Sequence, residues 1–260
     1  MPKLTAPQAI ELIQINRSIH NEVLKDADFY LQYKQPSGHD LINGGFHFIQ
    51  ANTLFLQTPL TDTSLGGFLI DYGHIVCCYL NTRQPRVNQH FILFHEIYHL
   101  LKGIDSNEAH FVSTEQSGDV SLDERKADYF ASLLLMPEKE MRNFFAVIKE
   151  EEIQIQIFKA MNQFKAPFKS VLIRLLELNI LLTEELFTTL FDESLDFSLL
   201  FAESGLDAFI VEPSYVLNIP DLEKVIAKNP MNEFIPESST EKNKQLFNQL
   251  IRSLQVKGDR

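Results

Sequence analysis

Two histidines and a glutamate stand at the spacing of a zinc site in the segment HEIYH, residues 95–99. On a helix, His95 and His99 project from the same face about one turn apart, so both imidazoles can bind one metal ion. Glu96 directly follows the first histidine, where its carboxylate can reach a metal-bound water without occupying a coordination position. The segment therefore predicts zinc bound by His95 and His99, with Glu96 as the general base.

A catalytic zinc site usually has three protein ligands and one open position, so a further ligand must come from another part of the chain. The run LDERKADYF places Glu124 and Asp128 four residues apart, on one face of a helix. We expect Glu124 to be the third metal ligand and Asp128 to orient a ligand histidine. Asp123 is the alternative ligand, but it is turned about 100° away on the helix and stands where acidic residues interact with a helix N-terminus.

A histidine pair on an apolar helix can also be a hydrogen-bonded feature of the core that holds no metal. Phe91, Phe94 and Leu100 make this segment apolar around most of its circumference. A buried histidine pair with nearby carboxylates needs a compensating partner, and a metal ion supplies one. Two histidines and one glutamate suit several divalent ions, among which zinc is preferred by precedent.

The elements that must position these residues indicate an α+β fold. Alternating apolar residues between Phe46 and Asn81 predict three or four strands in a small, mostly antiparallel sheet. A first helix is expected to end at about Lys25, and a loop is expected from Tyr33 to Gly45, where Pro, Gly and Asn cluster. We expect the sheet to pack on the active-site helix and an α-rich C-terminal half to follow. The helices predicted there are Leu122 to Met136, Glu138 to Lys149, Ile153 to Phe164 and Phe168 to Leu178.

The last part of the chain carries weaker signals. A strand is predicted at Ala208 to Val211, and helices are predicted near Leu222 to Lys228 and from Thr240 to Val256. Ser238 and Glu241 have the spacing of a capping box for the final helix. This region either recognises a partner or a signal, or it forms a structural cap over the helical core.

The composition, with 45% hydrophobic and 22% charged residues, is that of a soluble globular protein. A formal net charge of -12 disfavours direct binding to nucleic acid, because no run of Lys and Arg offsets it. No signal peptide and no membrane-spanning segment can be read from the sequence, so we expect a cytoplasmic protein. Cys77 and Cys78 are adjacent, which excludes a disulfide framework.

The motif-bearing segments resemble the ImmA/IrrE family of metallopeptidases, which are of the gluzincin type. The resemblance rests on HEIYHLL at residues 95–101, on ERKADYFASLLLMP at residues 124–137, and on NTRQPRVNQHFILF, which precedes the active-site helix. Tyr98 departs from the pattern, since many members of the family have glycine between the two histidines. The resemblance implies that this chain is a zinc-dependent metallo-endopeptidase.

The resemblance also implies a division of the chain. A zinc metallopeptidase domain is expected at residues 1–182, with its motif-bearing core at about 67–140. An α-rich C-terminal region of unknown role is expected at residues 183–260. No oligomeric state is predicted.

The function implied by the resemblance is that of an intracellular regulatory protease that cleaves a helix-turn-helix transcriptional repressor. Zn²⁺ would lower the pKa of its bound water to about 7 and polarise the substrate carbonyl, and Glu96 would pass the proton to the leaving amine. The alternative is a non-catalytic zinc-fold module that docks a transcription factor. Candidate hydrogen-bond donors to the tetrahedral oxygen, chosen by proximity in sequence, are Tyr79, Tyr98, His110 and Tyr129.

Overall fold

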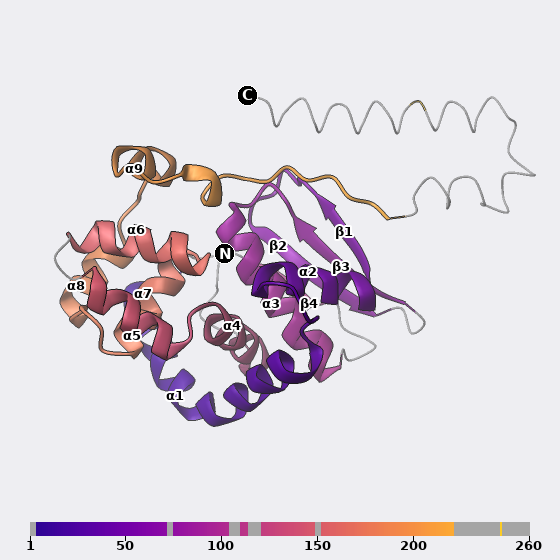
Figure 1. Ribbon diagram of the computed structural model, residues 1–260, viewed down its shortest axis with the longest axis horizontal. Helices are drawn as coiled ribbons and strands as arrows, with labels where there is room; N and C mark the ends of the chain where they lie inside the picture. The colour runs from indigo at the N-terminus through magenta and orange to yellow at the C-terminus, as the bar shows by residue number, and fades with distance from the viewer. Residues whose placement is uncertain are drawn as a thin grey trace, which may run out of the picture.

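A small sheet lies at one side of the molecule, and helices pack against one of its faces (Figure 1). The computed structural model describes residues 4–71, 75–103, 110–113, 121–148, 152–220 and 245. The strands are β1 (Leu54–Thr58), β2 (Leu65–Asp71), β3 (Val76–Asn81) and β4 (His110–Ser113). The helices are α1 (Ala6–Phe29), α2 (Leu41–Asn52), α3 (Arg86–Lys102), α4 (Leu122–Leu135), α5 (Glu138–Val147), α6 (Ile153–Phe164), α7 (Phe168–Glu177), α8 (Glu184–Phe191) and α9 (Phe197–Glu203), with a π-helical turn at Tyr30–Lys34 and a 3-10 helix at Ala208–Ile210.

The sheet has the strand order β1-β3-β2-β4. β2 runs antiparallel to both β3 and β4, whereas β1 runs parallel to β3. The prediction of an α+β fold with a small, mostly antiparallel sheet and a helix-rich second half is therefore confirmed. The order of the strands means that β1 and β3, although separated by β2 in the chain, are neighbours in the sheet.

The loop predicted from Tyr33 to Gly45 is present only at residues 35–40, and the strand pattern predicted at Phe46 was wrong, because α2 occupies residues 41–52. Asp40 caps this helix, its Oδ1 accepting a hydrogen bond from the Asn43 amide at 2.9 Å. A Cβ at Gly45 would lie 3.0 Å from Leu93 Cδ2 on α3. Gly45, one of the glycines that suggested a loop, thus lets α2 pack closely against α3.

The sheet presents two unlike faces. The inner face points toward α3 and contributes Phe55, Leu69, Cys78 and Leu80 to the hydrophobic core. The opposite face, which we call the outer face, follows from the alternation of side chains along each strand. Its apolar residues are Leu54 and Leu56 from β1, Phe68 and Ile70 from β2, and Cys77 and Tyr79 from β3, and the pair Thr58 and Asn81 lies at one end of it.

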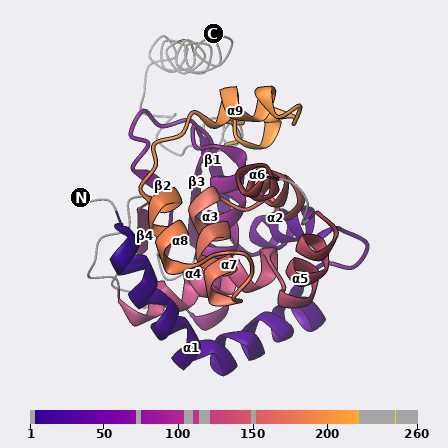
Figure 2. The ribbon, with the colours of Figure 1, turned by 90° about the vertical axis from the view of Figure 1, so that its left-hand side faces the viewer.

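Helix α4 packs against α3, and α1 crosses beneath α4 and reaches α7 and α8 (Figure 2). Helices α8 and α9, which lie beyond the domain boundary predicted at residue 182, contribute Phe187, Phe191 and Phe201 to the same hydrophobic core as α3 and α4. The division of the chain at that residue stays a prediction. None of the described helices combines the length and apolar character needed to cross a membrane.

The strand predicted at Ala208 to Val211 was wrong, since the chain forms a 3-10 helix there. We call residues 208–218 the strap, because they run over the start of α3 to the edge of β1 (Figure 1). The Arg86 side chain holds the strap: its Nη1 donates to the carbonyl oxygen of Phe209 at 2.9 Å, and its guanidinium lies 3.8 Å from the centroid of that ring. These contacts favour a turn over an extended strand. The helices predicted near Leu222 to Lys228 and from Thr240 to Val256 lie outside the described residues, apart from Gln245.

Candidate metal centre

Helix α3 holds the two motif histidines inside the protein. It follows Pro85, whose carbonyl oxygen accepts a hydrogen bond from the Gln89 amide at 3.0 Å. Apolar residues along its middle, among them Phe94 and Ile97, are fully buried between the sheet and the other helices. This burial fixes the rotation of the helix, so that His95 and His99, 2% and 5% exposed, both face α4.

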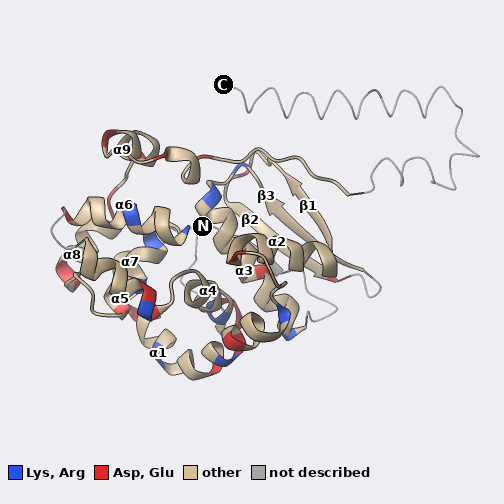
Figure 3. Ribbon diagram, viewed as in Figure 1, with Lys and Arg blue, Asp and Glu red and all other residues tan. Residues whose placement is uncertain are grey.

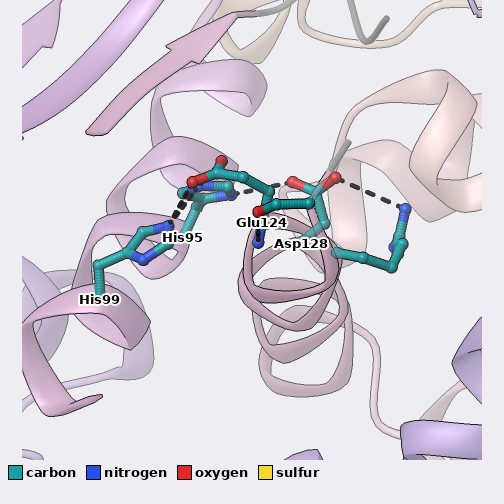
Figure 4. A network of polar contacts seen from close by, with 6 residues as sticks. His95, His99, Glu124 and Asp128 are labelled. Atoms are coloured by element: carbon teal, nitrogen blue, oxygen red, sulfur yellow. Dashed lines mark hydrogen bonds and ion pairs between the residues drawn. The ribbon is translucent and has the colours of Figure 1, made fainter. Parts of the chain in front are cut away.

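Helix α4 brings Glu124 against both histidines (Figure 4). The Nε2 atom of His95 lies 3.1 Å from Oε2 of Glu124, and the Nε2 atom of His99 lies 3.2 Å from Oε1. The two Nε2 atoms lie 3.1 Å from each other. Among the described residues, these three are the group of His, Cys, Asp and Glu side chains that converges well enough to hold a metal ion. Asp123, the alternative ligand, is not part of the group.

The distances within this group fit a tetrahedral zinc ion. Ligand atoms bound to zinc at about 2.0–2.1 Å stand about 3.3 Å apart at the corners of a tetrahedron. The observed separations of 3.1 Å, 3.1 Å and 3.2 Å are close to that edge length. His95, His99 and Glu124 therefore suit a metal ion as they stand, and the same donor set would accept other divalent ions.

Asp128 sets the orientation of His95. Its Oδ1 lies 2.9 Å from Nδ1 of His95, and its Oδ2 lies 3.5 Å from Nη1 of Arg125. A proton on Nδ1 donated to this carboxylate leaves the Nε2 lone pair directed at the metal position. The sequence-based expectation that Asp128 supports a ligand histidine matches this contact. Arg125, which holds the other carboxylate oxygen, was not singled out from the sequence.

Protonation within the metal-free group follows from burial and from these contacts. Burial alone would lower the pKa of His95, but hydrogen bonds with Asp128 and Glu124 outweigh it and raise the pKa to about 10. Burial tends to raise the pKa of Glu124, but hydrogen bonds from both histidines hold it well below its usual range. A metal ion that binds here must therefore displace a proton from the site.

Glu96 lies beside this group without joining it. Both of its carboxylate oxygens are buried and have no hydrogen-bond partner among the described residues. Burial, helped by the negative charge of Glu124 and opposed by His95, raises the pKa of Glu96 to about 8. A buried carboxylate of this kind needs a partner, and a water molecule at the metal position would supply a proton to share.

Gly67 of β2 makes room for the Glu96 carboxylate. A Cβ built at Gly67 would lie 3.3 Å from Oε1 of Glu96, 2.8 Å from the Tyr79 carbonyl oxygen and 2.7 Å from Cγ2 of Ile92. The strand can approach the Glu96 side chain this closely only because residue 67 has no side chain. This role of Gly67 was not predicted from the sequence, although a glycine inside a strand pattern is the signal that would have indicated it.

The tyrosines considered as donors to a tetrahedral oxygen lie elsewhere. Tyr79 is on the outer face of the sheet, where its hydroxyl donates to the Thr58 carbonyl oxygen at 2.7 Å. The Tyr129 hydroxyl lies 2.8 Å from Nδ1 of His20 on α1. The Tyr98 ring lies with its centroid 5.4 Å from that of Phe130 on α4, and Nζ of Lys102, which pairs with Asp26 of α1, lies 5.6 Å from the Tyr98 centroid. Burial and the carboxylates of α1 raise the pKa of this tyrosine. The side chain of His110, the remaining candidate, lies outside the described residues.

Charged side chains are mixed over the described helices. In Figure 3, blue and red positions are both scattered over the described helices, and no described element carries a continuous run of Lys and Arg in this view. This distribution agrees with the acidic net charge of -12.

Comparison with known proteins identifies the segment that holds this site. The family model described as the IrrE N-terminal-like domain, of the peptidase family M78, matches residues 50–176. The match confirms the resemblance to the ImmA/IrrE family over a segment that includes the HExxH motif, Glu124 and Asp128. The segment is thus of a metallopeptidase type. No curated protein matches the chain.

Proposed function

We propose that this chain, which carries an IrrE N-terminal-like domain of the M78 peptidases at residues 50–176, is a zinc-dependent metallo-endopeptidase. The observation that supports the proposal most directly is the convergence of His95, His99 and Glu124 beside the unpartnered, buried carboxylate of Glu96. Metal ligands alone would fit a structural site. A buried carboxylate placed next to them, with nothing else to bond, fits proton transfer.

The residues present divide the chemistry between them. His95, His99 and Glu124 would hold the ion, which when bound lowers the pKa of a water molecule and polarises the peptide carbonyl. Glu96 takes the proton of the attacking water on a carboxylate oxygen and later delivers it to the leaving amine nitrogen. Asp128 keeps His95 in the tautomer that leaves Nε2 free. The buried surroundings of Glu96 raise its proton affinity, so that it can hold the proton between the two transfers.

The proposed substrate is a helix-turn-helix transcriptional repressor. The support for this choice is the resemblance of the chain to the ImmA/IrrE family, whose members are often regulatory proteases of this kind. We further propose that the cleaved segment binds in an extended conformation along β4, the edge strand next to β2, because β2 reaches the Glu96 carboxylate through Gly67. Extended peptides bind readily to the edge of a sheet.

The experiment that tests the proposal compares the zinc-loaded protein with its Glu96→Gln variant. The full chain is incubated with candidate helix-turn-helix repressors and with an unfolded general substrate such as casein, and the products are identified by mass spectrometry. We expect cleavage by the unaltered protein and a rate about 10²–10⁴-fold lower for Glu96→Gln, at equal zinc content. Glu138→Gln, an exposed glutamate on α5, is the matched control and should cleave normally.

The alternative function, docking of a transcription factor without cleavage, makes the opposite prediction. In that case neither protein would cleave any substrate, and Glu96→Gln would bind a repressor as tightly as the unaltered protein. Elemental analysis separates a third outcome. If the unaltered protein binds no zinc, or if His99→Ala retains it, the metal site itself is wrong.

A further inference from the structure

Over β1, β2 and β3 the outer face of the sheet is mainly apolar, with the polar pair Thr58 and Asn81 at one end. Its six apolar side chains are Leu, Ile, Phe, Cys or Tyr, and the Phe68 and Tyr79 rings stack with their centroids 4.9 Å apart. Ile75, which precedes β3, is 41% exposed beside it. Soluble sheets usually alternate apolar residues toward the core with polar residues toward water. An apolar face on both sides indicates that both faces of this sheet are covered in the folded protein.

The described helices cover only one of these faces. The inner-face residues belong to the hydrophobic core, and α3 packs on β2 and β3 from that side. In contrast, Leu54, Leu56, Phe68 and Ile70 are half-buried and belong neither to the core nor to the residues packed against it. Within the described ranges, no helix lies on the outer face (Figure 1).

The strap brings the rest of the chain to the border of this face. Asn218 pairs with Gln57 of β1 through two backbone hydrogen bonds of 2.9 Å and 2.8 Å. Thr82, at the end of β3, donates its hydroxyl to the Val216 carbonyl oxygen at 2.8 Å. The strap therefore lies along the β1 edge, and the chain beyond residue 220 continues from there.

The sequence beyond the strap contains a segment suited to cover the outer face. Gln245 within it is helical and exposed. Around it, apolar residues recur with the period of a helix and form one stripe, while the opposite side is polar. The residues of the stripe are Leu246, Phe247, Leu250, Ile251 and Leu254.

We propose that residues 240–256 form an amphipathic helix that packs its apolar stripe on the outer face of the sheet. A helix of this length is about 25 Å long, enough to cross four strands spaced about 5 Å apart. The residues between the strap and this helix can span tens of ångströms at about 3.3 Å each, so the connection is long enough. The sheet then lies between two helical layers, and each of its apolar faces is buried. This inference does not depend on the proposed peptidase activity.

The test measures how well the outer face is shielded in the full chain. Ile70→Cys places a thiol on that face, and Cys77→Ala removes the native thiol that pairs with residue 70 across the strands. The rate of maleimide labelling at residue 70 is then measured by mass spectrometry with and without Leu250→Glu. We expect the charge in the stripe to raise the labelling rate about tenfold or more, because it detaches the helix. Gln245→Glu is the matched control and should leave the rate unchanged.

Two internal checks keep the outcome clear. Cys78, 1% exposed on the inner face, reports global unfolding, so the rate at residue 70 is read only where Cys78 stays unlabelled. Leu254→Glu replaces Leu250→Glu if that variant fails to fold. Equal labelling rates with a glutamate in the stripe and with Gln245→Glu would overturn the proposal. A labelling rate at residue 70 that rises when the protein is diluted would also overturn the proposal, because it would show that a second copy of the chain covers the outer face.

Discussion

Replacing Gly67 by alanine tests whether the close approach of β2 to Glu96 matters for activity. The added methyl would lie 2.7 Å from Cγ2 of Ile92 and 2.8 Å from the Tyr79 carbonyl oxygen, both of which are too short for contact. A carbonyl within a sheet cannot move aside easily, so α3 and β2 must separate. Overpacking of this kind costs about 1–3 kcal/mol of unfolding free energy. For a chain of this length, each kcal/mol lowers Tm by about 2–4 °C.

The effect on catalysis should exceed the effect on stability. The same methyl would lie 3.3 Å from Oε1 of Glu96, so separation of the strand from the helix shifts the carboxylate relative to the metal position. A displacement of about 1 Å typically costs about 100-fold in rate. We therefore expect Gly67→Ala to lower kcat/KM about 100-fold while its zinc content stays equal to that of the unaltered protein.

The assay combines peptide hydrolysis, elemental analysis and thermal unfolding on the same preparations. Gly44→Ala is the control, because a Cβ there would meet only the flexible side chain of Gln35, at 3.0–3.6 Å. Alanine inside a helix is favoured over glycine by about 0.5–1 kcal/mol, so Tm should stay the same or rise. Full activity in Gly67→Ala would refute the reasoning, and so would a loss of zinc that accounts for the lost activity.

Three further outcomes follow from the site and the core. Asp128→Asn should weaken zinc binding about 10–100-fold in competition with a chromophoric chelator, since it removes the charge that orients His95, whereas Asp123→Asn on the same helix should bind zinc normally. Zinc affinity should rise from about pH 6 to about pH 8, because hydrogen bonds to two carboxylates raise the pKa of His95 above its usual value and the metal must displace that proton. An affinity that does not change with pH would contradict this. Arg174→Met should cost about 3–5 kcal/mol in urea unfolding, because it leaves the buried Glu177 carboxylate without its partner at 2.7 Å. Adding Glu177→Gln should restore part of that loss, and no recovery would count against the ion pair as the cause.

The ligand set could be predicted from the sequence because its geometry is local. Residues four apart on a helix share a face whatever the rest of the chain does. This rule alone predicts that His95 lies beside His99 and that Glu124 lies beside Asp128. The expectation that α3 and α4 pack against each other required only that each helix be buried on the face that carries these residues. The apolar residues around both motifs indicated that burial.

The contacts of Glu96 could not be predicted in the same way. Gly67 lies close to this side chain, but it belongs to β2, which is distant from Glu96 in the sequence. Glycine also has no side chain whose chemistry would signal a role. The same ambiguity misled the interpretation of Gly45, where glycine marks close packing of α2 on α3 instead of a loop. Periodicity detects apolar faces, but it does not distinguish a turn from a close approach.

The strap was also beyond sequence reasoning. Ala208 to Val211 has the composition of a strand, and its conformation is decided by Arg86, which captures backbone carbonyls far along the chain. Tertiary contacts of this kind override local propensity. The order of the strands, with β1 parallel to β3, likewise depends on tertiary contacts and could not be derived from the sequence of each strand alone.

The aromatic cluster that joins the last helices to the rest of the protein decides where the chain can be cut. The Phe158 ring of α6 lies with its centroid 5.5 Å from that of Phe201 on α9, and the Phe168 ring of α7 lies 5.2 Å from that of Phe197. A fragment that ends with the matched family segment would therefore leave aromatic rings of α6 and α7 open to water, and such fragments tend to precipitate during purification. Recombinant fragments designed for assay or crystallisation should extend at least through the strap.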